Sequence, residues 1–354
     1  MAEIFQSLVL GFLVPSLLFP VHLVHRILSA IRGSTAPLDA RMAAAQCDVW
    51  LIPFPGTRTP ILAPHVLVIF DMVFRHVPEV YSDSERDHFH RLFSARGREA
   101  TLIYCGSNFV KEHDLIPCFP SKADRIRVFR LAPPLDIRPD AKTPDLNALG
   151  RKYGTRNRFL FYPAALRAHK NHAMLVRALN LLRQMPGHAD LTLVFTGEGR
   201  HSPELIRLIQ SEGLTEYVHF LGIIERADIQ AFYRHALLVP LPSLHEGYGL
   251  PLLEALQNQC PVVCADIPAF RELLEEQNDA VLFFNPHDAH AMAQAISSTI
   301  ARREELQDRQ REAYQHIARR DWHTVAQDFL QIFEEAYHLA AANKVPEEVI
   351  HHAA

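Results

Sequence analysis

Short apolar segments alternate with helical patterns along most of this chain, and this alternation limits the possible folds more than any other feature of the sequence. Short apolar runs bounded by turn-forming residues predict buried strands. Strands that alternate with helices along a chain form parallel sheets with helices on both faces. We therefore expect an α/β protein from residue 48 onward.

The predicted strands form two series. Those of the first series lie at 48–53, 66–70, 101–105 and 126–129, with an amphipathic helix over 82–100 that begins at a Ser or Asp cap. Those of the second series lie at 159–163, 191–196, 218–222, 237–240, 261–264 and 281–284. The helices of the second series are predicted at 171–185, 202–212, 226–235, 251–258 and 287–304. Two such series predict two Rossmann-like domains, joined by the Pro-rich and charge-rich stretch 132–145.

Composition excludes several classes of protein. A length of 354 residues fits two domains, and 48% hydrophobic with 21% charged residues is typical of a globular chain. A net charge of −4 gives no indication of nucleic-acid binding, so we expect no nucleic-acid partner. The five cysteines are scattered without a CxxC pair, which argues against a zinc ribbon or a disulfide scaffold and fits a cytoplasmic protein.

The N-terminal segment 1–45 is unusually apolar. Residues 4–25 contain no Asp, Glu, Lys or Arg and would be long enough to cross a bilayer. Pro15 and Pro20 interrupt the segment, so we favour a buried or membrane-surface segment over a transmembrane helix. Together with the basic stretch 91–98, it raises the alternative of peripheral contact with the inner face of the plasma membrane.

The loop that follows the strand at 237–240 has the most informative chemistry. Ligands of doubly wound sheets bind at the carboxyl ends of the strands, and helix N-termini bind phosphate there. In "HEGYGLPLLEAL" (245–256), Gly249 and Leu250 enter a helix with Pro251 expected at its first position. Glu246 in the loop and Glu254 in the first helical turn could accept hydrogen bonds from sugar hydroxyls. The alternative is a solvated loop glutamate and a glutamate that stabilises the helix dipole.

Other strand ends of the second series add compatible groups. "YPAALRAHKNHAMLVRAL" (162–179) places Arg167, His169 and Lys170 before a helix, where basic groups could neutralise a diphosphate. The alternative is an ordinary basic surface loop. In 194–200 a strand is also followed by glycines, and the glycine-containing end of 220–224 would let backbone groups meet a base.

These segments together resemble the retaining, nucleotide-sugar-dependent glycosyltransferases of family 4 (group 1), which have the GT-B fold of two Rossmann-like domains facing a cleft. "PSLHEGYGLPLLEALQNQCPVVCADIPAFREL" matches the Glu-x7-Glu segment of that family, and "FYPAALRAHKNH" matches its basic loop. The stretches 279–296 and 319–337 match the family pattern as well. The resemblance covers about residues 45 to 340.

The resemblance implies roles for individual residues. Glu246 would contact the donor sugar and Lys170 would pair with the donor diphosphate, so these two are the predicted catalytic residues. Glu254 would bind the ribose. The predicted donor-binding residues are Arg167, Gly222, Ile223, Ile224, Gly247, Tyr248, Gly249, Leu250 and Glu254.

The resemblance also implies an activity and a domain arrangement. A retaining hexosyltransferase that needs no metal or other cofactor would move a sugar from a nucleotide-diphosphate donor to a glycan or lipid-linked acceptor, in cell-surface polysaccharide or glycolipid synthesis. The implied domains are an acceptor-side domain at 46–135, a nucleotide-sugar domain at 136–320, and a C-terminal helix and tail at 321–354 that cross back to the first domain.

Three features depart from the family pattern. Phe70 stands where the family has a histidine before an aspartate, and Ala165 stands where it often has an arginine. The first strand and glycine-rich turn of the first domain are expected to be absent. An alternative function is therefore a catalytically impaired donor-binding or scaffold protein of a glycan assembly system. Another GT-B enzyme, such as a sugar phosphorylase or an epimerase, is a third alternative that the Glu-x7-Glu segment disfavours.

Overall fold

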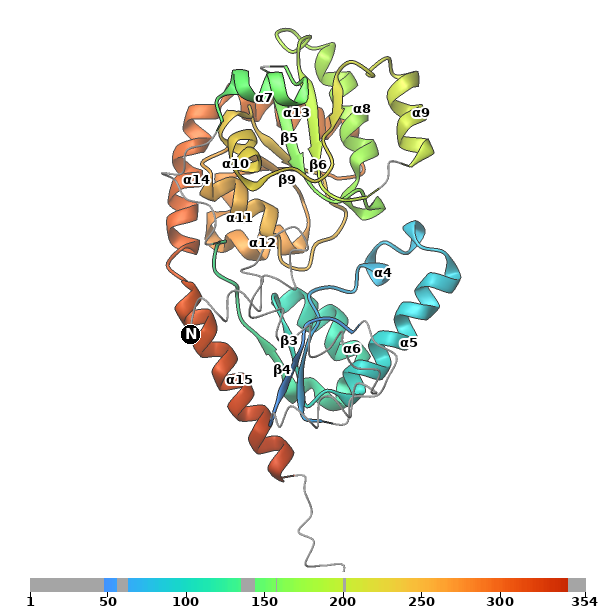
Figure 1. The fold of residues 1–354 in the computed structure, drawn as a ribbon, viewed down its shortest axis with the longest axis vertical. Helices are drawn as coiled ribbons and strands as arrows, with labels where there is room; N and C mark the ends of the chain where they lie inside the picture. The colour runs from blue at the N-terminus through green and yellow to red at the C-terminus, as the bar shows by residue number, and fades with distance from the viewer. Residues whose placement is uncertain (1–47, 56–62, 135–143, 157, 200–201, 343–354) are drawn as a thin grey trace, which may run out of the picture. The chain divides into compact units, whose positions relative to one another are not determined.

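The computed structural model describes residues 48–55, 63–134, 144–156, 158–199 and 202–342 (Figure 1). The described residues up to Leu131 and from Arg320 onward form one compact unit, and those from Ala132 to Arg319 form another. The expectations for the apolar segment 1–45 and for a missing first strand fall outside the described residues, as does most of the predicted linker.

The first unit contains a four-stranded parallel sheet. Its strands, in the order in which they pair, are β1 (Trp50–Ile52), β2 (His65–Val68), β3 (Leu102–Cys105) and β4 (Ile126–Val128). The four strands predicted for the first series are thus present. The shorter helical elements between them are α4 (Val73–His76), η1 (Pro78–Val80), the π-helix η2 (Val110–Leu115), α6 (Ile116–Cys118) and η3 (Pro120–Arg125).

The helix predicted at 82–100 is α5 (Asp83–Glu99), and Ser82 caps it. The Ser82 hydroxyl accepts a hydrogen bond from the Glu85 amide, and the Glu85 carboxylate accepts one from the Ser82 amide at 2.8 Å. This reciprocal capping box satisfies two backbone donors that a helix start otherwise leaves unpaired. Phe93 and Arg96 are buried in α5, and Arg96 pairs with Glu99 at 2.6 Å. The stretch 91–98 is therefore part of the packed helix and does not present all of its basic and apolar side chains to a membrane.

The last described helix, α15 (Trp322–Ala342), belongs to the first unit although it follows the second unit in the sequence. Phe329 of α15 contacts Tyr104 of β3 and Phe129, with ring centroids 5.0 and 4.8 Å apart. Trp322 is buried at the start of α15, and Glu335 forms an ion pair with Arg127 of β4. Within the described residues, no helix combines the length and the apolar character needed to cross a membrane.

The second unit contains six parallel strands. These are β5 (Phe159–Pro163), β6 (Thr192–Thr196), β7 (Val218–Phe220), β8 (Val239–Leu241), β9 (Val262–Ala265) and β10 (Leu282–Phe284), as predicted for the second series. Backbone hydrogen bonds from Phe161 to Leu238 (3.1 Å) and from Leu237 to Phe159 (3.0 Å) join β5 to the chain entering β8. The strand order is therefore β7-β6-β5-β8-β9-β10, which is the doubly wound order.

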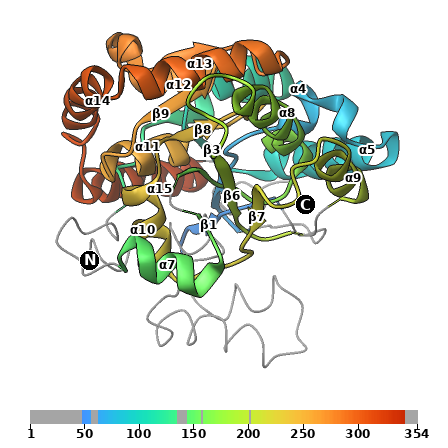
Figure 2. The ribbon, with the colours of Figure 1, turned by 90° about the horizontal axis from the view of Figure 1, so that it is seen from above.

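Helices cover both faces of this sheet. They are α7 (Leu146–Tyr153), η4 (Ala168–Lys170), α8 (His172–Arg183), α9 (Pro203–Ser211), α10 (Arg226–His235), α11 (Leu250–Gln257), α12 (Pro268–Leu274), η5 (Glu275–Ala280), α13 (Ala289–Ala301) and α14 (Arg303–Ile317). Figure 2 shows α8 and α13 together on one face and α10 and α11 on the opposite face. The predicted helices are present, whereas α7, α12 and α14 were not predicted, because α7 and α12 are short and α14 is rich in charged residues.

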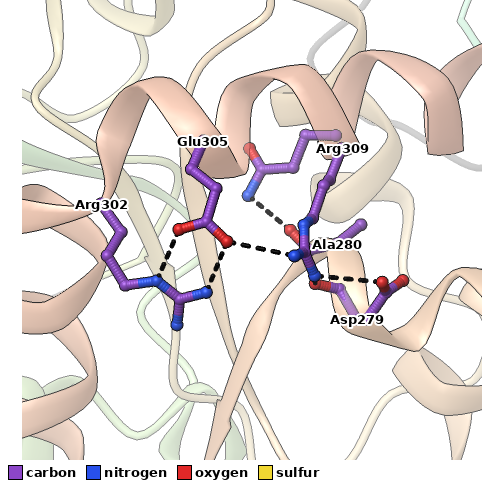
Figure 3. Close-up of polar contacts among 6 residues, drawn as sticks. Asp279, Ala280, Arg302, Glu305 and Arg309 are labelled. Carbon is purple, nitrogen blue, oxygen red and sulfur yellow. Dashed lines mark hydrogen bonds and ion pairs between the residues drawn. The ribbon is translucent and has the colours of Figure 1, made fainter.

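A chain of charges runs along the start of α14 (Figure 3). Glu305 accepts two hydrogen bonds from Arg302, at 2.8 and 2.9 Å, and Arg309 lies 3.1 Å from both Glu305 and Asp279. These side chains are exposed, so each pair contributes little to stability. The neighbouring Gln310 is only 3% exposed, and its amide donates to the carbonyls of Val262 and Ala280, both at 3.1 Å. This buried amide ties α14 to the start of β9 and to the end of η5, just before β10.

Replacing Gln310 should therefore destabilise the second unit. Gln310→Ala leaves two buried carbonyls without their donor and opens a cavity, so we expect the free energy of unfolding to fall by about 2 kcal/mol, measured by urea denaturation. Gln307→Ala is the matched control, because Gln307 donates a single 3.2 Å bond from an exposed site one turn earlier. Equal losses in the two variants would contradict the role assigned to Gln310.

Candidate functional site

The site lies at the switch point of the second sheet, where the strand order reverses between β5 and β8. Lys170 ends η4 in the loop after β5, and Glu246 lies in the loop after β8. The Lys170 Nζ atom is 2.6 Å from the Glu246 Oε1 atom, and the two side chains are only 16% and 11% exposed. The structure therefore brings together the two residues that the sequence singled out for catalysis, as a partly buried ion pair.

The surroundings of this pair hold Glu246 in its charged form. Burial raises the pKa of Glu246, but the charge of Lys170 and hydrogen bonds with Lys170 and Ser243 outweigh burial, so the pKa lies below its usual value. Tyr162 of β5 donates to the Lys170 carbonyl at 3.0 Å, and its hydroxyl lies 3.2 Å from the Ser243 hydroxyl. Glu246 is thus an ionised hydrogen-bond acceptor at neutral pH.

Asn171 joins three strand-end loops, and the sequence reasoning did not single it out. Its side-chain amide donates to the Pro242 carbonyl at 3.0 Å and to the Pro286 carbonyl at 2.8 Å. These carbonyls follow β8 and β10, while Asn171 itself follows β5 and has a left-handed backbone with φ of 60°. Asparagine tolerates this conformation better than most residues, and an Asn directly before a helix start was the available signal.

The N-terminus of α11 faces the same strand ends and has the predicted glycine entry. Gly249 is the N-cap, with φ of 103°, and a Cβ atom there would lie 3.1 Å from the Phe270 ring. Leu250 is the first helical residue and Pro251 the second, so the prediction of Pro251 at the first position is wrong by one residue. No side chain of the described residues caps α11, and an uncapped helix N-terminus can bind an anion. Gly247 and Tyr248, which is buried, connect Glu246 to this helix.

Glu254 lies in the second turn of α11, and the prediction of the first turn is wrong because the helix already begins at Leu250. Its Oε2 atom accepts a hydrogen bond from the Tyr233 hydroxyl of α10 at 2.8 Å. Burial raises the pKa of Glu254, and Tyr233 and the charge of Arg226 oppose this effect only in part. The sequence reasoning missed both α10 residues, because only the packing of α10 against α11 reveals them.

Arg167 lies apart from the Lys170–Glu246 pair. Its guanidinium is 3.6 Å from Glu198 in the loop after β6, and both side chains are largely exposed. The loops after β5 and β6 touch through their backbones at Ala164, Ala165 and Gly197, where a Cβ atom on Gly197 would lie 2.6 Å from the Ala164 carbonyl. Arg167, which was predicted to bind the diphosphate, therefore pairs with an exposed carboxylate at the edge of the site.

The loop after β7 provides an exposed apolar surface. Gly222 has φ of 66°, and its carbonyl accepts hydrogen bonds from the Thr196 hydroxyl at 2.8 Å and the Gly197 amide at 2.9 Å. These bonds fix the loop to the end of β6. Ile223 is 68% exposed and Ile224 is half-buried, so this fixed turn presents an apolar side chain at the carboxyl end of the sheet.

Phe70, the departure in the first domain, follows β2 in the first unit. Its ring packs edge-on against Tyr104, with centroids 5.9 Å apart. The position is therefore occupied by a half-buried aromatic side chain that offers no hydrogen bond.

Known proteins are similar in sequence mainly to the second unit of this chain. The family described as "Glycosyl transferases group 1" matches residues 150–316. The O-antigen chain mannosyltransferase B of Escherichia coli is 28% identical over 202 residues, which are 57% of this chain and 52% of that protein. The D-inositol 3-phosphate glycosyltransferase of Salinispora tropica is 32% identical over 170 residues, or 46% of this chain and 35% of that protein. The chain thus spans about half or less of the length of these relatives.

Solved structures agree in fold. The Anabaena protein HepE, in complex with UDP and glucose, superposes with a TM-score of 0.66 at 21% identity, over 89% of this chain and 84% of that chain. WaaG, a glycosyltransferase involved in lipopolysaccharide biosynthesis, gives 0.62 at 16% identity, over 83% and 80%. The chain therefore has the GT-B fold, and its residues 150–316 match the group 1 glycosyltransferase family.

Proposed function

We propose that this protein is a retaining hexosyltransferase that moves a sugar from a nucleotide-diphosphate donor to an acceptor hydroxyl. The observation that carries the proposal is the partly buried Lys170–Glu246 pair at the switch point of the second sheet. A fixed cation and a fixed carboxylate at one strand edge match the two ends of a sugar joined to a diphosphate. The cation suits the phosphates, and the ionised carboxylate suits the sugar hydroxyls.

In the proposed reaction, the bond between the anomeric carbon and the diphosphate oxygen breaks and a bond to the acceptor oxygen forms on the same face of the sugar. Lys170 and the amides of Gly249 and Leu250 stabilise the charge that develops on the leaving diphosphate. The proton of the acceptor hydroxyl passes to the leaving phosphate oxygen, so no side chain is assigned as general base. Because Lys170 and the α11 terminus supply positive charge, the proposed step requires no metal ion.

The remaining residues of the site are proposed to hold the nucleotide. Glu254 accepts hydrogen bonds from the ribose, and the turn at Gly222, Ile223 and Ile224 lies against the base. Gly247 and Tyr248 connect Glu246 to the backbone amides that are proposed to bind the phosphates. Arg167 lies at the edge of the site and pairs with Glu198. Breaking this pair to bind the donor would cost little free energy, because both side chains are exposed.

The relatives suggest a substrate class. One is a mannosyltransferase of the E. coli O-antigen chain, and the structural neighbour WaaG takes part in lipopolysaccharide biosynthesis. We propose a glycan or lipid-linked acceptor in cell-surface polysaccharide or glycolipid synthesis at the inner face of the plasma membrane. GDP-mannose is the first donor to test.

Loss of either member of the ion pair should abolish transfer. We expect Glu246→Ala and Lys170→Ala each to lower kcat/KM by about 100-fold or more, because each removes a charged group from the reacting centre. Transfer is measured by release of the nucleoside diphosphate, and circular dichroism checks that the fold is retained. Glu204→Ala and Arg207→Ala remove an exposed ion pair on α9 and serve as controls. Normal turnover in both purified site variants would defeat the assignment.

Asn171 should matter for transfer through the loops that it holds together. Asn171→Gly keeps a residue that tolerates φ of 60° but removes both amide hydrogen bonds, so we expect transfer to fall about tenfold with a small change in melting temperature. Asn171→Ala adds backbone strain to the same loss, and we expect a further destabilisation of about 1 kcal/mol. Unchanged transfer in the glycine variant would show that the loops need no such tie.

A catalytically impaired donor-binding protein is the second candidate, and the apolar ring of Phe70 favours it. Titration calorimetry with a panel of nucleotide sugars, alongside a turnover assay with the same compounds, separates the two functions. Tight binding without turnover selects the second candidate, and turnover selects the first.

A further inference from the structure

We propose that Tyr233 of α10 positions the Glu254 carboxylate as an acceptor for a ribose hydroxyl, with Arg226 of the same helix adding positive charge, so that α10 sets the selectivity of the site for ribonucleotide over deoxyribonucleotide donors. The inference rests on the proposed function and adds to it the residues through which Glu254 acts. Tyr233 is a positioning residue in this scheme, since it touches Glu254 rather than the donor.

Packing fixes the Tyr233 hydroxyl. The Tyr233 side chain is fully buried, and its ring meets the Phe161 ring of β5 edge-on with centroids 5.1 Å apart. The hydroxyl donates to the Glu254 Oε2 atom at 2.8 Å. Burial, with help from the charge of Glu254, raises the pKa of Tyr233 well above its usual value, so the hydroxyl remains a proton donor throughout the working range of pH.

One carboxylate oxygen of Glu254 is engaged and the other is available. Within the described part of the chain, Tyr233 is the hydrogen-bond donor found for the Glu254 side chain. An ionised carboxylate has about four acceptor positions, so one donor on Oε2 leaves Oε1 for a ligand hydroxyl. The bond from Tyr233 orients the carboxylate without saturating it.

A second residue of α10, Arg226, acts on Glu254 through its charge. It is the first residue of α10 and directly follows the loop that contains Gly222 and Ile223. Its positive charge lowers the pKa of Glu254, in opposition to burial, which raises it. The guanidinium is itself half-buried, and burial lowers its pKa while Glu254 raises it. One short helix thus supplies Glu254 with a hydrogen bond from Tyr233 in its third turn and with the positive charge of Arg226 at its first residue.

Cys260, another ionisable group near Tyr233 and Glu254, adds no charge to their surroundings. Cys260, at the end of the turn after α11, interacts with Tyr233, but burial raises the pKa of its thiol to about 12, with Arg303 of α14 opposing weakly. The thiol therefore carries no charge near neutral pH. Tyr233 and Arg226 both lower the pKa of Glu254 and so favour its ionised form, against burial, which raises that pKa.

The test is Tyr233→Phe, which keeps the buried ring and removes the hydroxyl. Without this donor the pKa of Glu254 rises further, so the carboxylate becomes protonated at a higher pH than in the wild type. Because the ionised form accepts the ribose hydroxyl, binding of UDP or GDP should weaken as pH falls and should do so at a higher pH in the variant. We expect about tenfold weaker binding at neutral pH, measured by titration calorimetry between about pH 5 and about pH 8.

Deoxy analogues provide a second measurement. The wild type should bind UDP or GDP more tightly than the 2′-deoxy or 3′-deoxy form, and this preference should shrink in Tyr233→Phe and disappear in Glu254→Gln. If Tyr233 only held α10 against α11, its replacement would weaken the binding of all of these ligands equally.

Tyr153→Phe is the matched control. Tyr153 of α7 also donates its hydroxyl to a buried carboxylate on α10, that of Asp228, at 2.5 Å. The control loses the same kind of bond to the same helix and should keep the wild-type pH profile and deoxy preference. A Tyr233→Phe variant that matches the wild type, or equal shifts in both variants, would overturn the inference. A wild type that binds no nucleoside diphosphate would instead overturn the proposed function itself.

Discussion

The reversal of strand order between β5 and β8 is the constraint on which the rest of the site depends. Parallel strands deliver their following loops to one edge, and helices that leave in opposite directions at the reversal keep that edge open. Lys170 and Glu246 come from the two loops at this point, which explains how residues 76 positions apart form a 2.6 Å ion pair. The same edge receives the α11 N-terminus, so a cation, an anion and free backbone amides converge without any side chain reaching far.

The backbone conformation of the strand-end loops holds these groups in place. Gly249 and Gly197 occupy left-handed conformations where a side chain would strike Phe270 or the Ala164 carbonyl, so these loops tolerate little else. Asn171 adds the polar tie, because its amide holds the loops after β8 and β10 to the loop after β5. The charged pair is therefore preorganised by the chain around it, as the proposed stabilisation of a leaving group requires.

Sequence reasoning found the strands and the chemistry-bearing loops because both are local patterns. It placed Glu246, Lys170 and Gly249 at strand ends, and the structure gathers them. It placed the start of α11 one residue too late, which put Pro251 at the first helical position and Glu254 in the first turn, because helix boundaries depend on where the chain leaves the sheet. Tyr233 and Arg226 carried no signal at all, since a tyrosine or an arginine on an amphipathic helix is ordinary until its neighbour is known.

The sequence by itself determined the two series of strands, the glycine entry to α11 and the residues proposed to bind a charged sugar donor, because periodicity, turn chemistry and side-chain functional groups are properties of short segments. Only the tertiary structure decided which of these groups meet. It paired Lys170 with Glu246 and sent Arg167 to Glu198 instead. It also gave Glu254 its partners on α10, because contacts between distant segments arise from the order of the strands and the packing of helices against them.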